Sequence, residues 1–388
     1  MSLSSSTSGS QQQPPIILYH YPFSPYAKRI VWYLHLRGIS YTQCLQPMIL
    51  PRPDLSSLLG IKYRRIPLLS IGRDVYLDTR LILSKLEDLD LPSLNPKLSA
   101  APGTDALALQ SLLSHYSIDG GLFSRAAQLL FSLDNPLLRD PQFLADRADF
   151  VAGGGGGNAP PSKFPSREEM AALGPEALAD LRDYCQLLET TVLADGRDWI
   201  LKNTTDTDNN NNNNNNNNRP GLADIEAVFV LHWVMSLPGA LPKEQFNDDK
   251  FPRVWKWVER FRVAVGETTT PTQQTAAQKE GDGNSKVATV KGDKARDLIL
   301  GAGWNEDSEK KEVEAGEAIV QFHGLKKGML VEVWPTDSGS APAHRDVGRL
   351  VSLDSREVVI ENEKGVRVHA PRHGFRVKPS SQAVASSL

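Results

Sequence analysis

Residues 16–41 read IILYHYPFSPYAKRIVWYLHLRGISY, and this stretch decides the fold of the N-terminal part of the chain. Residues 16–21 are mostly β-branched or aromatic, which predicts a short buried strand. Ser24 followed by Pro25 predicts a helix start, because serine is a strong N-cap and proline loses no hydrogen bond at the first helical position. Gly38 is well placed to end that helix. The apolar stripe of the helix consists of Ala27, Ile30, Val31 and Leu34.

The same helix carries basic residues that we expect on its other faces, namely Lys28, Arg29 and Arg37. Residues 40–46 read as a second strand. A strand, a helix and a second strand in this order predict a parallel pair that is joined by a right-handed crossover.

A second stretch, residues 63–87, reads YRRIPLLSIGRDVYLDTRLILSKLE. Residues 66–71 and 75–77 predict two strands, and the three residues between them include a glycine, which suits a hairpin. A further helix is expected from Asp78 onward. With a loop and a short helix at residues 47–60, this order of elements predicts a thioredoxin-like α/β domain.

The rest of the chain changes character twice. Residues 104–265 read as helical, whereas five short strands are expected from residue 325 onward, which resembles small β-barrels of the KOW or Tudor kind. Between the two, residues 297–304 form a short apolar patch that we expect to pack on the helical region. The predicted fold class is therefore multidomain, with an α/β thioredoxin-like domain, an all-α helical bundle domain and a small all-β barrel-like domain.

Composition predicts where these parts begin and end. A run of ten asparagines at residues 209–218 and a glycine-rich stretch at residues 152–161 cannot build a core, so both predict solvated low-complexity loops. The predicted organisation is a disordered tail at 1–14, the thioredoxin-like domain at 15–93, the helical domain at 100–265 with loops at 152–165 and 203–219, a linker at 266–290, a small β-rich module at 291–379 and a tail at 380–388.

Global composition excludes several classes of protein. The net charge of −3 gives no general attraction to nucleic acid or to a membrane surface. The two cysteines, Cys44 and Cys185, make no disulfide framework and favour a reducing compartment. The first residues lack the basic start and apolar core of a secretory signal, and no apolar run is long enough to span a bilayer. We therefore expect a cytoplasmic protein that does not bind membranes.

The N-terminal motifs together resemble the glutathione S-transferase superfamily. These motifs are the turn Ser24, Pro25 and Tyr26, the step from Ile66 to Pro67, and the pair Asp78 and Thr79 at a helix start. The resemblance continues, with weaker motifs, in a tryptophan-led turn at 199–201, in residues 221–225 and in a closing helix at 251–257. It covers residues 15–265 and departs from the family pattern at Gly221, where a serine or threonine is usual.

The resemblance implies a glutathione site. It assigns Ser24 as the catalytic residue, whose hydroxyl stabilises the glutathione thiolate at a helix N-terminus. Tyr19, Tyr21 and Tyr26 are rival phenols for that role. Lys62, Arg64 and Arg65 are candidates for the glycyl carboxylate. The residues expected to bind glutathione are Phe23, Pro25, Arg64, Arg65, Ile66, Pro67, Asp78 and Thr79.

The chemical roles within this site follow from the groups present. A cis peptide before Pro67 is implied, and the backbone of Ile66 then pairs with the cysteinyl backbone of glutathione. Asp78 would pair with the γ-glutamyl ammonium, and Thr79 with free helix-start N–H groups would hold its carboxylate. The alternative is that Asp78 only caps its helix. A cysteine is absent at Ser24 and at Ala27, which disfavours thiol–disulfide exchange at this turn.

The implied function is conjugation of the glutathione thiolate to an electrophilic small molecule, with glutathione as co-substrate, no metal and a homodimeric assembly. One alternative is a non-catalytic binding or interaction protein that keeps the transferase fold. Another is nucleic-acid or protein binding through the β-rich module, whose basic residues alternate with Trp334 and Phe375. Acidic residues in the same module bring its net charge near zero, so we expect a solvated surface of mixed sign and no nucleic acid.

Overall fold

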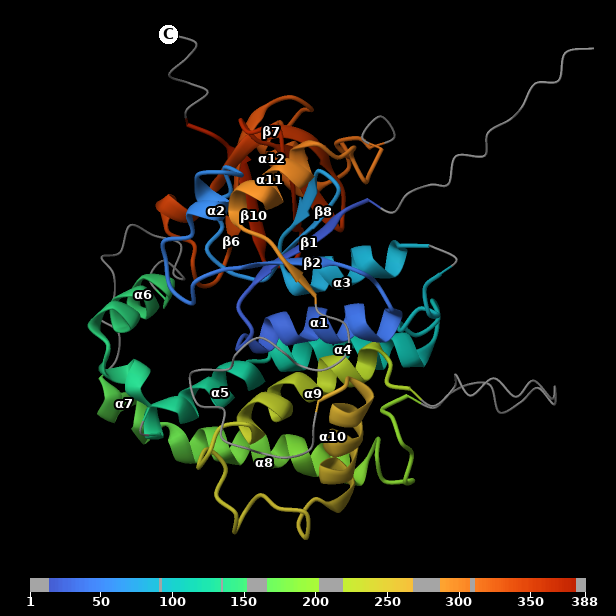
Figure 1. Cartoon of the computed structure of the whole chain (residues 1–388), viewed down its shortest axis with the longest axis vertical. Helices are drawn as coiled ribbons and strands as arrows, with labels where there is room; N and C mark the ends of the chain where they lie inside the picture. The colour runs from blue at the N-terminus through green and yellow to red at the C-terminus, as the bar shows by residue number, and fades with distance from the viewer. Residues whose placement is uncertain are drawn as a thin grey trace, which may run out of the picture.

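A computed structural model of the chain describes residues 14–90, 93–133, 135–151, 166–201, 219–267, 287–307 and 311–381 (Figure 1). Most of the two predicted tails, of the two predicted low-complexity loops and of the predicted linker lies outside these residues. None of the described helices is long and apolar enough to cross a bilayer.

The N-terminal domain has the predicted order of elements and the thioredoxin-like fold. Its central strand β1 pairs in parallel with β2 and antiparallel with β3, and β3 continues into the hairpin with β4. The elements are β1 (Ile16–His20), α1 (Pro25–Arg37), β2 (Thr42–Leu45), α2 (Pro53–Ser56), β3 (Leu68–Ile71), β4 (Asp74–Tyr76) and α3 (Thr79–Asp88).

Helix α1 begins and ends where its sequence predicts. The Ser24 side chain accepts a hydrogen bond from the Ala27 N–H at 3.2 Å, and Gly38 closes the helix with a positive φ of 68°. Arg29 and Arg37 are both buried, which the sequence did not predict. Helix α1 lies between the sheet and the helical domain, so its basic residues need partners inside the protein.

The helical domain is built around α9, which is apolar on all sides and buried along most of its length. Asp224 in its first turn accepts hydrogen bonds from Gly221 N–H, Ile200 N–H and Trp257 Nε1, and burial raises the pKa of Asp224 to about 6. The elements are α4 (Asp105–Ile118), α5 (Leu122–Gln128), η1 (Leu129–Ser132), η2 (Pro136–Arg139), α6 (Pro141–Val151), α7 (Arg167–Ala172), α8 (Gly174–Thr190), α9 (Leu222–Met235) and α10 (Pro252–Ala264).

The C-terminal region contains the five predicted strands, and it adds a strand and two helices before them. Residues 288–289, at the end of the predicted linker, form a strand that pairs with β2. The elements are β5 (Ala288–Thr289), α11 (Gly292–Leu300), α12 (Ala318–His323), β6 (Leu330–Pro335), η5 (Pro342–His344), β7 (Asp346–Leu353), β8 (Glu357–Glu361), β9 (Arg367–Pro371) and β10 (Phe375–Pro379).

One sheet runs through the N-terminal domain and the C-terminal region. Within the described residues it has ten strands in the order β10-β6-β7-β8-β9-β4-β3-β1-β2-β5. The junction is a parallel pairing of β4 with β9, in which Val75 lies opposite Val368 and Tyr76 opposite His369. The C-terminal strands therefore extend the first domain instead of standing apart from it, which the sequence did not predict.

Two cores cover the two faces of the N-terminal part of this sheet. Leu18 of β1 belongs to a first core shared with α1, α3 and the helical domain. Its neighbours Ile17 and Tyr19 point the other way, into a second core shared with α2 and the C-terminal region. Figure 1 shows the result, with the green and yellow helical domain and the orange and red C-terminal region on opposite sides of the blue N-terminal domain.

The expectation that residues 297–304 pack on the helical domain is wrong. Ala295 and Ile299 of α11 lie in the second core, on the opposite face of the sheet. The reason is the preceding strand β5, which pairs with β2 and delivers α11 next to α2. An apolar patch in a sequence shows that a segment packs, but not on which face of a sheet.

A buried set of charges lies at the junction of β4 and β9. His369 is hydrogen-bonded through Nε2 to Asp74 at 2.9 Å and through Nδ1 to Glu357 at 3.1 Å. Lys85 of α3 reaches Glu357 at 2.8 Å and Glu306 at 2.7 Å. Burial opposes protonation of His369, but its carboxylate partners outweigh burial and raise the pKa of His369.

We predict that the His369 charge stabilises the fold in a pH-dependent way. A raised folded-state pKa means that this stabilisation is complete below the unfolded value of about 6.5 and is lost as the pH rises through the folded value. His369→Gln should lower the free energy of unfolding at pH 6 by about 3–5 kcal/mol, the usual cost of breaking a buried pair. The difference from wild type should shrink toward pH 9.

Urea denaturation at pH 6, 7.5 and 9 measures this difference. His35→Gln, which changes an exposed histidine of α1, is the matched control and should keep the wild-type pH dependence. Equal pH dependence in the His369→Gln variant and the wild type would contradict the assignment of the charge to His369.

Candidate functional site

The candidate site lies at the N-terminal ends of α1 and α3. Ser24 is 3% exposed and caps α1, and Pro25 occupies the first helical position. Phe23, just before the cap, is 53% exposed. The Ser24 oxygen accepts the Ala27 N–H, so the hydroxyl hydrogen remains to be donated to another group. The helix start adds positive potential at the same place.

The rival tyrosines lie in different surroundings. Tyr19 points into the second core, on the sheet face opposite to α1, and burial raises its pKa. Tyr26 packs its ring against Phe123 at 4.7 Å and Phe229 at 5.5 Å, and burial raises its pKa to about 12. Both phenols stay protonated at neutral pH and keep an O–H to donate. The third rival, Tyr21, is half-buried three residues before Ser24, so Ser24 remains a prediction among these hydroxyls.

A buried arginine that the sequence did not single out joins three helices at this site. Arg29 of α1 donates one guanidinium N–H to Thr79 Oγ1 at the start of α3 and another to Glu226 of α9. Arg29 is 0% exposed and Glu226 4% exposed, so this pair is fully enclosed. Thr79 accepts from Arg29 and keeps its own O–H to donate elsewhere. The ends of α1 and α3 are thereby held in a fixed relation to the helical domain.

Asp78 caps α3 in an unusual backbone conformation. Its φ is +63°, the only positive value for a described residue other than glycine. Its carboxylate accepts the Arg80 N–H at 2.9 Å and pairs with the Arg80 guanidinium at 3.2 Å. Burial favours the neutral acid, but Arg80 outweighs burial and lowers the pKa of Asp78. The group is an ionised carboxylate, whether it caps the helix or binds a ligand ammonium.

The step from Ile66 to Pro67 is cis, as the resemblance implied. Pro67 is buried and Ile66 is half-buried, directly before β3. The backbone of Ile66 is therefore located at the beginning of the central sheet.

Both arginines that precede this step are already engaged. Arg64 is 4% exposed and pairs with Asp146 at 2.8 Å and with Asp149, both on α6. Its guanidinium also lies 5.2 Å from the ring centroid of Phe150. A ligand carboxylate could reach Arg64 only by displacing α6.

Arg65 is the more accessible of the two arginines. It pairs with Asp337, whose side chain is 66% exposed, and also contacts Ser338. The Gly339 N–H donates to the Phe150 carbonyl at 2.6 Å, so the segment after β6 meets α6 beside these arginines. Arg65 would have to exchange Asp337 for a ligand carboxylate, whereas the exposed side chain of Lys62 is nearby in sequence.

The arrangement can hold a small peptide with charges of both signs. It offers a hydroxyl at one helix start, a carboxylate and a hydroxyl at a second, and a guanidinium held by an exchangeable partner. The sequence indicated each of these residues through local motifs. It gave no signal for Arg29, Glu226, Asp149 and Asp337 as partners, because each pair joins segments that are distant in sequence.

Comparison with known families gives two matches. Residues 18–92 match the family described as glutathione S-transferase, N-terminal domain. Residues 125–270 match a domain of unknown function, DUF7962. No curated protein matches the sequence.

Solved structures share the fold at low sequence identity. A glutathione S-transferase-like protein from Pseudomonas syringae is 20% identical with a TM-score of 0.56, and the alignment covers 94% of this chain and 99% of that chain. A rice glutathione S-transferase solved in complex with glutathione is 18% identical with a TM-score of 0.43, and the alignment covers 66% of this chain and 92% of that chain. The Pseudomonas alignment is long enough to include the C-terminal region.

We predict that Arg29 and Glu226 are energetically coupled. Arg29→Met leaves Glu226 as a buried charge without its partner, and it should cost about 3–5 kcal/mol of unfolding free energy. The double variant Arg29→Met/Glu226→Gln should recover at least half of that loss, because no uncompensated charge remains.

Urea denaturation of the two single variants and the double variant measures the coupling. Arg125→Met, which breaks an exposed pair with Asp180, is the control and should cost about 1 kcal/mol or less. Additive costs of the Arg29 and Glu226 changes would show that the pair does not act as a unit.

Proposed function

Because the chain has the fold of the glutathione S-transferase superfamily, with residues 18–92 matching its N-terminal domain, we propose that it binds glutathione at the starts of α1 and α3. In this proposal it conjugates the glutathione thiolate to an electrophilic small molecule. The observation that supports it most is the Arg29 bridge to Thr79, which holds the helix start capped by Ser24 beside the one capped by Asp78. The rice protein solved with glutathione adds support from its own bound ligand.

Each part of glutathione has a partner in this proposal. The γ-glutamyl ammonium pairs with Asp78, and the carboxylate beside it accepts from the Thr79 hydroxyl and from N–H groups of the first turn of α3. The cysteinyl backbone pairs with the backbone of Ile66. The glycyl carboxylate takes the place of Asp337 on Arg65, because that partner is exposed and Arg64 is enclosed. Phe23 and Pro25 flank the thiol.

Ser24 activates the nucleophile. Its hydroxyl donates a hydrogen bond to the thiolate, and the start of α1 adds positive potential, so both lower the thiol pKa. Each unit by which the pKa falls toward neutral raises the thiolate fraction about tenfold. The thiolate then attacks the electrophilic carbon, and the leaving group departs with the electron pair of the broken bond. We also propose that the co-substrate is a small electrophile, that the chain forms a homodimer and that it is cytoplasmic.

The pairing of Arg64 and Arg65 with acidic residues of the chain favours a second candidate function. In it, the fold is a non-catalytic interaction scaffold, and Asp149 and Asp337 permanently neutralise the arginines that a transferase would use. Nucleic-acid binding is less well supported, because Arg345 lies over Trp334 at 4.3 Å and pairs with Glu332 at 3.4 Å. These contacts leave a surface of mixed sign.

We predict opposite effects of two substitutions on glutathione binding. Millimolar glutathione should raise the thermal unfolding midpoint of the wild type, because a ligand of the native state stabilises it. Asp78→Asn should abolish the increase, although asparagine caps helices as well as aspartate does. Asp337→Asn should free Arg65 and tighten binding about two- to fivefold, the factor expected from losing a competing exposed ion pair.

Differential scanning fluorimetry over a range of glutathione concentrations gives both results. The scaffold function predicts no increase for the wild type or for Asp337→Asn at millimolar glutathione. That outcome would support the scaffold function and reject the transferase proposal.

We predict that Ser24→Ala lowers the rate of conjugation to 1-chloro-2,4-dinitrobenzene about 10- to 100-fold. A hydrogen bond to a charged group contributes about 1.5–3 kcal/mol, and each 1.4 kcal/mol is a factor of ten. The pKa read from the pH dependence of the rate should rise by about 1–2 units in the variant. Thr104→Ala removes the comparable cap of α4 and is the control, with unchanged activity.

Full activity of Ser24→Ala would move the thiolate role to another hydroxyl. Tyr21→Phe and Tyr26→Phe test the two phenols next to the helix start.

A further inference from the structure

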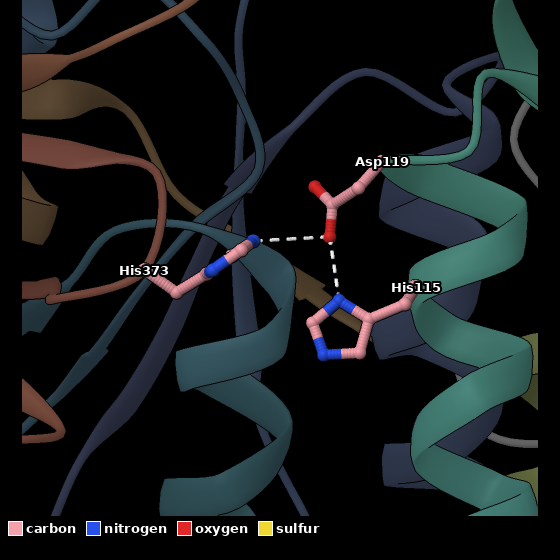
Figure 2. A group of neighbouring side chains, drawn as sticks. All are labelled: His115, Asp119 and His373. Carbon is pink, nitrogen blue, oxygen red and sulfur yellow. Dashed lines mark hydrogen bonds and ion pairs between the residues drawn. The ribbon is translucent and has the colours of Figure 1, made fainter.

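Three side chains converge on one point between the helical domain and the C-terminal region (Figure 2). His115 and Asp119 come from the end of α4, four residues apart, and His373 comes from the turn between β9 and β10. His115 Nδ1 lies 2.7 Å from Asp119 Oδ2, and His373 Nε2 lies 3.0 Å from the same oxygen. The potential ligand atoms of the three residues all lie within 4.8 Å of one another.

Two imidazoles and one carboxylate are a ligand set for a transition metal ion. Zn²⁺ binds imidazole nitrogen and carboxylate oxygen at about 2.0–2.2 Å, so the ligand atoms of a tetrahedral site lie about 3.3 Å apart. The observed separations need only small side-chain rotations to reach this value. His115 and Asp119 are already neighbours, because residues four apart share a helix face. Mg²⁺ and Ca²⁺ prefer oxygen ligands and fit this set poorly.

The surrounding charges favour a cation. Arg80 donates to both oxygens of Asp119, at 3.0 and 2.9 Å, and also pairs with Asp78. The carboxylates of Asp119 and Asp78 and the guanidinium of Arg80 together leave a formal charge of −1 beside the two imidazoles. Arg80 can stay on Oδ1 and orient the carboxylate while Oδ2 faces the metal, as partners of ligating carboxylates commonly do.

Accessibility also fits a metal site. The side chains of His115, His373 and Asp119 are 53%, 59% and 37% exposed, so an ion can enter directly from solvent. Three protein ligands leave a fourth position for water.

A second cluster of potential ligands provides a useful contrast. Glu306, Glu357 and His369 also lie close together, but the ammonium groups of Lys85 and Lys311 bind both of these glutamates. His369 uses both ring nitrogens for carboxylates. Two ammonium groups already neutralise that cluster, whereas Asp119 is paired with the single guanidinium of Arg80, which Asp78 shares.

We propose that His115, Asp119 and His373 form a binding site for a divalent transition metal ion, with Zn²⁺ as the expected occupant and water as its fourth ligand. The ion links the helical domain to the β9–β10 turn, which the polypeptide brings together from positions 254 residues apart. The three ligands are not among the residues proposed to bind glutathione, although Arg80 links Asp119 to Asp78 of that site.

Isothermal titration calorimetry of the metal-free full chain with ZnCl₂ tests the site, with the purification tag removed. We expect one Zn²⁺ per chain, with a binding constant reduced at least tenfold in His115→Ala and in His373→Ala. His35→Ala, another exposed histidine, is the matched control and should bind as the wild type does. MgCl₂ at the same concentration should give no binding.

Titration with Co²⁺ provides a direct readout of coordination. Tetrahedral coordination should give strong visible absorption in the wild type and in His35→Ala, and it should be absent in His373→Ala. Since all three substituted histidines are partly or largely exposed, circular dichroism should confirm that the variants fold.

Two outcomes would overturn the proposal. One is zinc binding of equal strength in the wild type and in both ligand variants, which would locate the metal elsewhere. The other is no binding by the wild type at millimolar zinc, which would reduce the three residues to a hydrogen-bonded contact between the two parts of the chain.

Discussion

The parallel pairing of β4 with β9 is the constraint on which the rest of the structure depends. Asp74 of β4 is fully buried at this junction, where it binds His369 and accepts the backbone N–H groups of Asn305 and Glu306. An unpaired strand edge with a buried carboxylate would be a severe liability for a domain that stood alone. The N-terminal domain and the C-terminal strands are therefore parts of one cooperative unit, although their compositions suggest separate modules.

Local patterns in the sequence predicted the elements well, because their causes are local. Ser24, Pro25 and Gly38 mark the two ends of α1 through capping geometry. The five C-terminal strands were predicted from short strand-like runs separated by turn signals. The partners of these elements could not be predicted in the same way. The burial of Arg29 could not be predicted, because α1 is covered by the sheet on one side and by the helical domain on the other. The face chosen by α11 depends on β5, a two-residue strand too short to be recognised in a sequence.

The candidate site shows the same division between local motif and distant partner. Motifs around Ser24, Pro67 and Asp78 indicated where a ligand would be held, since helix starts and a proline step carry their geometry with them. The ion-pair partners of Arg64 and Arg65 at this site lie outside the N-terminal domain. Asp149 of α6 and Asp337 after β6 set the pairing of Arg64 and Arg65, and neither belongs to a motif of the N-terminal domain. The sequence of the first domain is therefore enough to predict its fold. Whether Arg64 and Arg65 are free to bind a ligand depends on acidic residues of the helical domain and of the C-terminal region.

The long separation between β4 and β9 has a consequence for biosynthesis. At a translation rate of about 5–20 residues per second, the 295 residues between Asp74 and His369 take roughly 15–60 s to emerge from the ribosome. Throughout that interval the β4 edge has no strand beside it, and Asp74 lacks its imidazole. The nascent N-terminal domain therefore carries an unpaired strand edge, a feature prone to pair with other chains, until the last strands have been made.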